Sequence, residues 1–314
     1  MARATTKKKT TKQRTVGQKA VRWVFRPMPL TIAALLSTVW LCWPMVQQKL
    51  PTLDDREEYR IGVDEIVISP APRWVPVDLV QRVFARAEFG DSLSLQDPMV
   101  SEKIALAFHT HPWIEQLKRV RKSFPAKITV DVVYREPVAM VQVVGGGYLP
   151  IDKFGHLLPD EDFSPADIDR YPIITNVTSI PIRRGESWGD AAVVGAAELA
   201  AVLTKKNEGE QSWWRALGLK AILAPQQVAI GKDAANLQYR LLTAGGSQIL
   251  WGRSPFTQHP AELKVEQKLE RMAEYHRSFN GFDDSPAPVV IDIRDWQRTK
   301  RTPLAKERSG TSFQ

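Results

Sequence analysis

Apolar and polar residues largely alternate along residues 127–135. Ile128, Val130 and Val132 fall on one face of the pattern, and most residues between them are polar. A period of two is typical of a β-strand with one buried face and one face in water. We therefore predict a strand here, in a small sheet that helices cover on one face only.

The preceding stretch, 112–123, is also strand-like, but its alternation is broken. Leu117 and Val120 are both apolar although they are three residues apart, so a regular strand would send them to opposite faces. A β-bulge adds one residue and restores the common face. We predict such a bulge near Lys118–Arg119, followed by a turn at 123–125.

Helical spacing appears upstream of these two strands. Pro76 precedes a stretch whose apolar residues recur every three or four positions, and Asp97-Pro98 resembles the capped start of a second helix. A short strand at 61–69 comes before both. The pattern predicts a β-α-α-β-β unit over residues 61–139.

Residues 140–297 contain further strand-like segments and two helical stretches, one rich in alanine near 190–206 and one at 260–280. We predict a mainly antiparallel β domain with flanking helices, so the fold class is α+β. The tail, 298–314, is polar and basic, and we predict that it is disordered. The last predicted strand comprises Val289, Val290, Ile291, Asp292, Ile293, Arg294, Asp295 and Trp296.

The N-terminal part has a different character. Residues 27–48 carry no formal charge, and as a helix they are about long enough to cross a bilayer. We predict a retained transmembrane helix there, a basic arm at 1–26 in the cytoplasm, and a linker at 49–60. The alternative, a cleaved signal peptide, fits less well because no small-residue cleavage site follows. By the positive-inside rule, the bulk of the chain then lies outside the cytoplasm.

Charge is distributed unevenly. The chain has 43 Lys and Arg against 35 Asp and Glu, a formal net charge of +8, yet ten of the basic residues and none of the acidic ones fall within residues 1–53. Basic residues beside a membrane helix usually set topology and contact anionic lipid heads, so we expect no nucleic acid partner. The single cysteine, Cys42, lies inside the predicted span, and no disulfide is expected in the exported part.

The sequence contains no recognisable catalytic or cofactor-binding motif. His109 and His111 form a lone H-x-H pair, which we interpret as solvated loop residues, because zinc sites need three or four converging ligands. The glycine run 145–147 lacks the Lys-Ser or Lys-Thr of a phosphate loop, and it fits a hairpin turn. We therefore expect no enzyme activity, no cofactor and no metal.

This absence directs attention to the sheet edges. An edge strand presents unpaired N–H and C=O groups, which can accept a strand from another protein. Basic residues at 118–122 would border one such edge and favour an acidic partner. The segment 289–296 offers a second edge, since no later strand is expected to cover it.

Several short words occur in an order and spacing that resemble one family. They are HPWI at 111–114, FP at 124–125, REPVA at 135–139, IDKFG at 151–155, YPII at 171–174, GSQILWG at 246–252 and VIDIR at 290–294. With the β-α-α-β-β unit behind one apolar span, this set resembles the FtsQ/DivIB family of bacterial division proteins. In that family a single membrane helix precedes a polypeptide-transport-associated (POTRA) domain and a C-terminal β domain.

The resemblance implies a non-enzymatic scaffold at the division septum, anchored in the inner membrane, that links division proteins outside the cytoplasm. Its implied partners are single-pass proteins of the FtsB and FtsL kind and septal wall synthesis proteins. It implies partner binding by residues 289–296. It also implies that Trp113, Ile114 and Val120 of the first domain contact the membrane or other division partners.

Three rival functions are considered. A POTRA protein for outer-membrane assembly or secretion would normally carry repeated first domains or a barrel of about eight or more strands. An envelope hydrolase with an unrecognised site would depend on residues such as His109 and His111. A tethered DNA-binding protein would act through the arm at 1–26 and show salt-dependent affinity.

Overall fold

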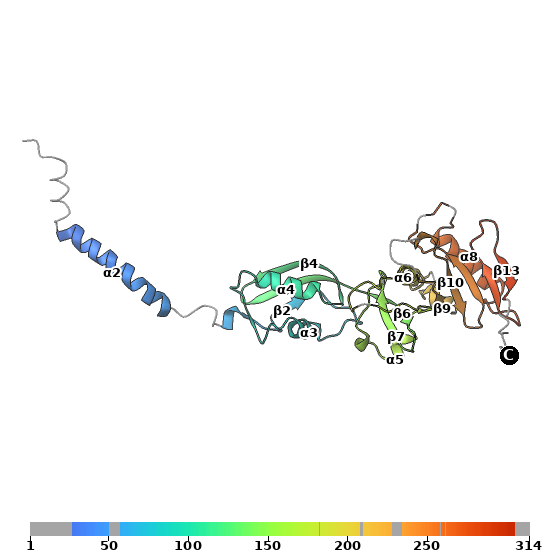
Figure 1. Cartoon of the computed structure of the whole chain (residues 1–314), viewed down its shortest axis with the longest axis horizontal. Helices are drawn as coiled ribbons and strands as arrows, with labels where there is room; N and C mark the ends of the chain where they lie inside the picture. The colour runs from blue at the N-terminus through green and yellow to red at the C-terminus, as the bar shows by residue number, and fades with distance from the viewer. Residues whose placement is uncertain are drawn as a thin grey trace, which may run out of the picture. The chain divides into compact units, whose positions relative to one another are not determined.

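The computed structural model describes residues 27–49, 57–181, 183–207, 210–227, 234–257, 259–260 and 262–304 (Figure 1). The chain divides into two compact units, Met1–Tyr59 and Arg60–Gln314. The predicted basic arm at 1–26 and most of the predicted linker at 49–60 lie outside the described residues.

The first unit contains helix α2 (Pro27–Lys49) and the 3-10 turn η2 (Glu57–Tyr59). Helix α2 coincides with the predicted span, and its side chains from 31 to 45 are exposed. Across the described residues, however, no helix combines the length and the apolarity that crossing a membrane requires. The expectation of a transmembrane helix at 27–48 is therefore not confirmed.

The second unit begins with a three-stranded sheet in the order β2–β5–β4, with β2 parallel and β4 antiparallel to β5. The order of elements along the chain is the one that the periodicity predicts. A short antiparallel pair is formed by β1 (Arg60–Ile61), which precedes β2, and β3 (Leu93–Ser94), which lies between the two helices in sequence. The elements are β2 (Ile66–Ile68), α3 (Leu79–Arg86), α4 (Val100–His109), β4 (Ile114–Ser123) and β5 (Lys127–Tyr134).

The alternation in β5 works as expected. Ile128, Val130 and Val132 are buried in one hydrophobic core with the apolar faces of α3 and α4. Burial of each such side chain stabilises the fold by about 1.5–3 kcal/mol. The predicted bulge in β4 is confirmed, because the pairing with β5 shifts between Leu117 and Arg119.

A larger sheet has eight strands in the order β13–β12–β11–β10–β9–β8–β6–β7. It is mixed rather than mainly antiparallel, because β6 with β8, β8 with β9 and β11 with β12 are parallel pairs. Its strands are β6 (Pro137–Gln142), β7 (Tyr148–Asp152), β8 (Ile173–Thr175), β9 (Leu219–Leu223), β10 (Tyr239–Thr243), β11 (Gln248–Gly252), β12 (Val289–Asp292) and β13 (Lys300–Pro303).

Two of the three parallel pairs follow from the two long helices of this part. Helix α6 (Ala191–Leu203) connects β8 to β9, and α8 (Val265–Ser278) connects β11 to β12. A helical crossover between neighbouring strands leaves them parallel. The shorter elements are η3 (Asp160–Asp162), α5 (Pro165–Ile168), α7 (Trp213–Ala216) and η4 (Ala234–Asn236).

Helix α6 is alanine-rich because it is buried on most sides. Its N-terminus is capped by Asp190, whose carboxylate accepts a hydrogen bond of 2.9 Å from the Ala192 N–H. A side chain at Gly195 would collide with the Tyr239 hydroxyl of β10. Only small residues permit this close approach of helix and sheet. This explains why the helical stretch near 190–206 is rich in alanine.

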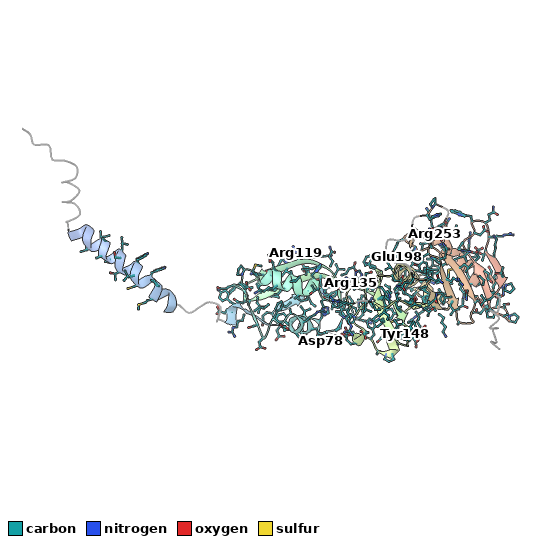
Figure 2. The ribbon with its side chains drawn as sticks, in the orientation of Figure 1. Asp78, Arg119, Arg135, Tyr148, Glu198 and Arg253 are labelled. Carbon is teal, nitrogen blue, oxygen red and sulfur yellow. The ribbon has the colours of Figure 1, made fainter. Side chains whose placement is uncertain are left out.

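The segment IDKFG, residues 151–155, forms a turn at the end of β7 around the buried Asp152. Its carboxylate accepts hydrogen bonds from the Phe154 N–H at 2.9 Å and the His156 N–H at 2.8 Å. Arg135, which lies between β5 and β6 and is labelled in Figure 2, donates to the other oxygen at 2.6 Å and thereby connects the small sheet to the large one. Gly155 has a φ of 73°, where glycine avoids strain.

The predicted disorder of the tail is wrong for part of it. Lys300–Pro303 forms β13, which pairs antiparallel with β12 at the end of the large sheet. Residues 305–314 lie outside the described part of the chain. Strand β12 is therefore not the edge of the sheet, which corrects the expectation that no later strand covers residues 289–296.

Candidate functional site

Strand β13 is the outermost strand at one end of the large sheet. Within the described residues it pairs with β12 alone, and all four of its residues are exposed. Its outer side therefore presents backbone groups without strand partners in that part of the chain. Such an edge is a template for a strand from another molecule.

The register decides which groups of β13 face outward. The Leu304 N–H donates to the Pro288 carbonyl at 3.0 Å, and antiparallel bonding alternates from pair to pair. Thr302 thus bonds to β12, while the backbone of Arg301 and Pro303 faces away. Because proline has no N–H, Arg301 supplies the outward donor of this strand.

Ion pairs hold β13 against the sheet. Lys300 Nζ lies 2.6 Å from Asp295, and this ammonium lowers the pKa of the Asp295 carboxyl to about 2. The Arg301 guanidinium lies 3.0 Å from Asp284 and sits over the Phe279 ring, 5.8 Å from its centroid. The strand is attached mainly by polar contacts, because it contributes no buried side chain.

Arg271 of α8 secures the turn between β12 and β13. Its guanidinium donates to the carbonyl of Ile293 at 3.1 Å and of Trp296 at 3.2 Å, and it also bonds to the Asp295 carbonyl. One side chain thus satisfies three backbone acceptors. The helix thereby fixes where the last strand begins.

A shallow hollow of about 580 Å³ adjoins this turn. Asp292 and Arg294 form an ion pair of 2.7 Å on its wall, and the hydrogen bond from Arg294 lowers the pKa of Asp292. Trp296 lines the same hollow with 56% of its surface exposed. The turn therefore offers charged groups and an aromatic ring next to the open edge.

A buried charged cluster supports the floor of the hollow. Glu262 lies 2.9 Å from Arg253 and 2.5 Å from Lys268, whose ammonium also sits over the Trp251 ring. Burial lowers the pKa of Lys268. Burial alone would raise the pKa of Glu262, but the hydrogen bonds from Lys268 and Arg253 bring it below its ordinary value. Arg253 of this cluster is labelled in Figure 2.

The predicted partner-binding segment is split between core and surface. Val289, Ile291 and Ile293 are buried, and Val290 and Asp292 are half-buried. Arg294 and Trp296 are exposed, and Asp295 is half-buried. The structure thus leaves the end of the segment accessible and pairs its beginning with β13.

Strand β4 forms a second edge, in the small sheet. Within the described residues it pairs only with β5. The backbone of Ile128 and Val130 bonds toward β2, so Thr129 and Asp131 bond toward β4, and the groups of Val120 and Lys122 face outward. The predicted contact residue Val120 therefore lies on an open edge.

The basic residues along β4 are partly engaged. Arg119, labelled in Figure 2, lies 3.2 Å from Asp131, and Arg121 lies 3.8 Å from the same carboxylate. Lys122 Nζ donates to the carbonyls of Leu95 and Asp97. Because Asp131 on β5 balances the charges of Arg119 and Arg121 on β4, this row of basic residues does not disrupt the sheet.

Trp113 and Ile114 occupy the core of the small domain. Trp113 has no exposed surface, and its indole N–H donates to Asp162 at 2.8 Å. His111, expected in solvent, is also buried, and burial lowers its pKa to about 4. Buried side chains cannot contact a partner directly, so Trp113 and Ile114 can influence binding only through the position of β4.

The described residues contain no cluster of three or more histidine, cysteine, aspartate or glutamate side chains suited to a metal ion. Arg271 and Arg301 are the site residues that the sequence did not single out. Neither arginine belongs to a recognisable motif, and the sequence around each contains other charged residues. Their role depends on contacts with segments that are remote in sequence.

No family model matches the chain. The chain is similar to the "Cell division protein FtsQ" of Anaeromyxobacter sp. (strain K), with 26% identity over 223 residues, which is 71% of this chain. The chain spans 64% of the length of this relative. The similarity supports the resemblance to the FtsQ/DivIB family that the sequence words indicate.

Proposed function

We propose that this FtsQ/DivIB-like chain is a non-enzymatic cell division protein that binds other division proteins. The observation that carries the proposal is the similarity to an FtsQ protein over most of the chain. The open edges of both sheets supply a mode of action, because they can accept a partner strand without any catalytic group.

The outer edge of β13 is the proposed main docking site. The outward N–H and C=O of Arg301 would bond to the partner backbone, while Arg294 and Trp296 would contact its side chains. Backbone pairing supplies affinity, and side-chain contacts supply selectivity. By the family resemblance, the partner is a single-pass protein of the FtsB or FtsL kind.

The β4 edge is the proposed second docking site. The outward backbone of Val120 and Lys122, bordered by Arg119 and Arg121, favours a partner segment with acidic side chains. A second division protein could then bind while β13 is occupied, because the two edges belong to different sheets. This arrangement suits a scaffold.

Membrane association is also part of the proposal, and its support is the sequence alone. The basic arm at 1–26 and the uncharged stretch at 27–48 favour contact with an anionic bilayer and placement of the remainder outside the cytoplasm. Fractionation of cells checks this part, since release of the chain from membranes by salt alone would contradict a stable anchor.

The division role is tested by imaging a fluorescent fusion of the full chain in dividing cells. The expected result is a signal that concentrates at midcell as constriction begins. A uniform peripheral signal throughout the cell cycle would contradict the proposal. It would instead favour a general envelope function such as outer-membrane assembly or secretion.

A further inference from the structure

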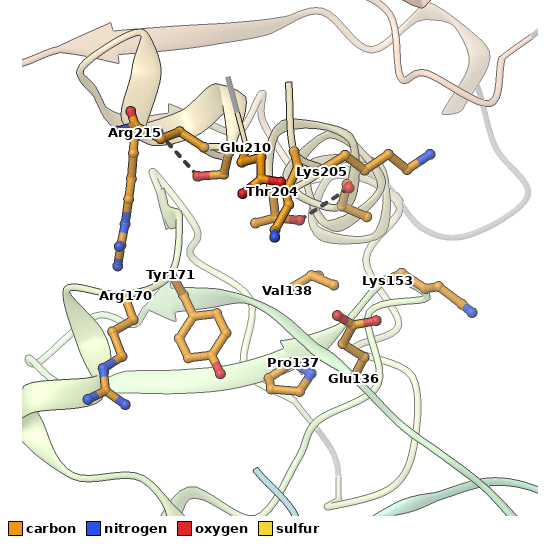
Figure 3. A pocket seen from close by; sticks show the side chains of 14 residues that line it. Glu136, Pro137, Val138, Lys153, Arg170, Tyr171, Thr204, Lys205, Glu210 and Arg215 are labelled. Atoms are coloured by element: carbon orange, nitrogen blue, oxygen red, sulfur yellow. Dashed lines mark hydrogen bonds between the residues drawn. The ribbon is translucent and has the colours of Figure 1, made fainter. Parts of the chain in front are cut away.

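A cleft of about 690 Å³ opens in the second unit. One wall is the end of α6 with the following loop and the start of α7. The other wall is the beginning of β6 with Arg170 and Tyr171 (Figure 3). None of its lining residues belongs to the docking edges described above.

The upper wall is built from ordered backbone contacts. The Asn207 N–H donates to the Gln211 carbonyl at 2.7 Å, and the Trp213 N–H donates to the Lys205 carbonyl at 3.1 Å. Trp214 is buried beneath this wall. The wall is therefore anchored by an aromatic side chain and closed by its own hydrogen bonds.

The lining carries an excess of positive charge, with five basic side chains against the two acidic ones of Glu136 and Glu210. Two of the basic groups are neutralised, because Lys153 lies 3.2 Å from Glu115 and Arg170 lies 2.9 Å from Asp167. The other three basic side chains of the lining, Lys205, Lys206 and Arg215, have no ion pair among the described residues.

The preference of lysine for helix C-termini accounts for Lys205 and Lys206, which follow the end of α6. The same preference of basic residues applies to Arg215, which lies in the last turn of α7. Figure 3 shows the Arg215 side chain reaching down toward the level of Arg170 and Tyr171 from the opposite wall. Arg215, which has no ion pair among the described residues, thus adds a positive charge to the end of the cleft where Arg170 is paired with Asp167.

The floor is apolar. Pro137 and Val138 of β6 are buried, and the half-buried Tyr171 ring stands beside them. Glu136 lies toward the other end of the cleft, with its carboxylate directed into the gap (Figure 3). A uniformly charged polyanion would meet repulsion from Glu136 and Glu210 and would gain nothing from the apolar floor.

We propose that this cleft binds an acidic peptide segment of a partner protein. Its carboxylates would lie at the end formed by Arg170 and Arg215, and a neighbouring apolar side chain would pack against the half-buried Tyr171 ring. Arginine suits this role because its planar group binds carboxylate in two-pronged fashion. The site is independent of strand docking at β13.

The test uses the full chain and a fluorescent synthetic peptide of repeated Glu-Leu-Glu-Ala, with fluorescence anisotropy as the readout. Arg170→Glu/Arg215→Glu is expected to weaken binding about tenfold or more. The matched control is Arg183→Glu/Lys220→Glu, which makes the same charge change at exposed sites outside the cleft. It should leave the affinity within about twofold.

Two further arms identify the ligand class. A Gln-Leu-Gln-Ala peptide should bind much more weakly, and inorganic polyphosphate or phosphatidylglycerol vesicles should displace the acidic peptide poorly. Wild-type affinity of the Arg170→Glu/Arg215→Glu variant, with an unchanged thermal melt, would overturn the proposal. Tighter binding of polyphosphate or of the vesicles than of the peptide would also overturn it.

An edge variant separates this site from the proposed function. Arg301→Pro removes the outward donor of β13 and should bind the acidic peptide as the wild type does, because Arg301 is not part of the cleft. Loss of peptide binding in Arg301→Pro, at unchanged thermal stability, would show that the peptide docks at the sheet edge and would overturn the assignment to the cleft.

Discussion

Arg271 is the residue that joins α8 to the turn between β12 and β13. Its guanidinium serves three carbonyl groups in a partly buried setting. A charged donor of this kind contributes more than an exposed ion pair, because its removal leaves acceptors without partners. The geometry of the proposed docking edge therefore depends on one long side chain from a helix.

Replacement of this residue, Arg271→Ala, is expected to lower the free energy of unfolding by about 1–3 kcal/mol. Urea denaturation of the full chain measures the change. Arg277→Ala, an exposed position on the same helix, is the control, and it should stay within about 0.5 kcal/mol of the wild type. Equal effects of the two changes would show that Arg271 does not secure the turn.

Asp152 is the second residue on which the fold depends, because it links Arg135 to the hairpin end at 152–156. Burial alone would raise the pKa of this carboxyl, but hydrogen bonds from His156 and Arg135 bring it below its ordinary value. A carboxyl whose pKa is lower in the folded state stabilises the protein above its unfolded pKa of about 3.9. That contribution is lost as the pH falls through the folded value.

Asp152→Asn is therefore expected to lower the free energy of unfolding by about 3 kcal/mol at neutral pH, because it leaves the buried guanidinium of Arg135 without its charge partner. The stability of this variant should also decline less steeply than the wild type below about pH 4. Denaturation across a pH series checks both effects. Asp160→Asn is the control. It removes an exposed ion pair with Arg184 and should lower the free energy of unfolding by less than about 1 kcal/mol.

Strand β13 is the element on which the proposed docking depends, and its hydrogen bonds can be observed directly. The amide of Thr302 bonds to β12, whereas the amide of Arg301 faces outward. Native-state hydrogen exchange should show slow exchange at Thr302 and fast exchange at Arg301 in the isolated chain. Slow exchange at Arg301 would mean that the edge is already covered.

The sequence predicted the elements whose signals are local. Strand β5 and the bulge in β4 follow from the spacing of apolar residues, which directly reports the buried face. The two long helices were also expected. Their effect on the sheet was not, because periodicity identifies faces and says nothing about the direction of neighbouring strands.

The outermost strand at this end of the large sheet was predicted one strand too early. Lys300–Pro303 has no apolar residue and no buried position, so it carries no periodic signal. Its pairing depends on Asp284 and Asp295, which supply the ion pairs, and on backbone bonds to β12. Contacts between residues remote in sequence cannot be inferred from composition, and a basic tail without them is ordinarily disordered.

At the scale of the molecule, two sheets with open edges and a basic cleft lie on one chain. None of the three surfaces requires a cofactor, and each suits a partner of different shape. The similarity to an FtsQ protein supports a role in cell division. In the function that we propose, the β13 edge is the main docking surface.

The most direct measurement is septation in cells depleted of the native protein and supplied with Arg301→Ala or Arg301→Pro. Both changes remove the ion pair with Asp284, but only proline removes the outward N–H. With equal expression and equal thermal stability, Arg301→Ala cells should divide and Arg301→Pro cells should form filaments. Normal division with Arg301→Pro would contradict strand docking at this edge.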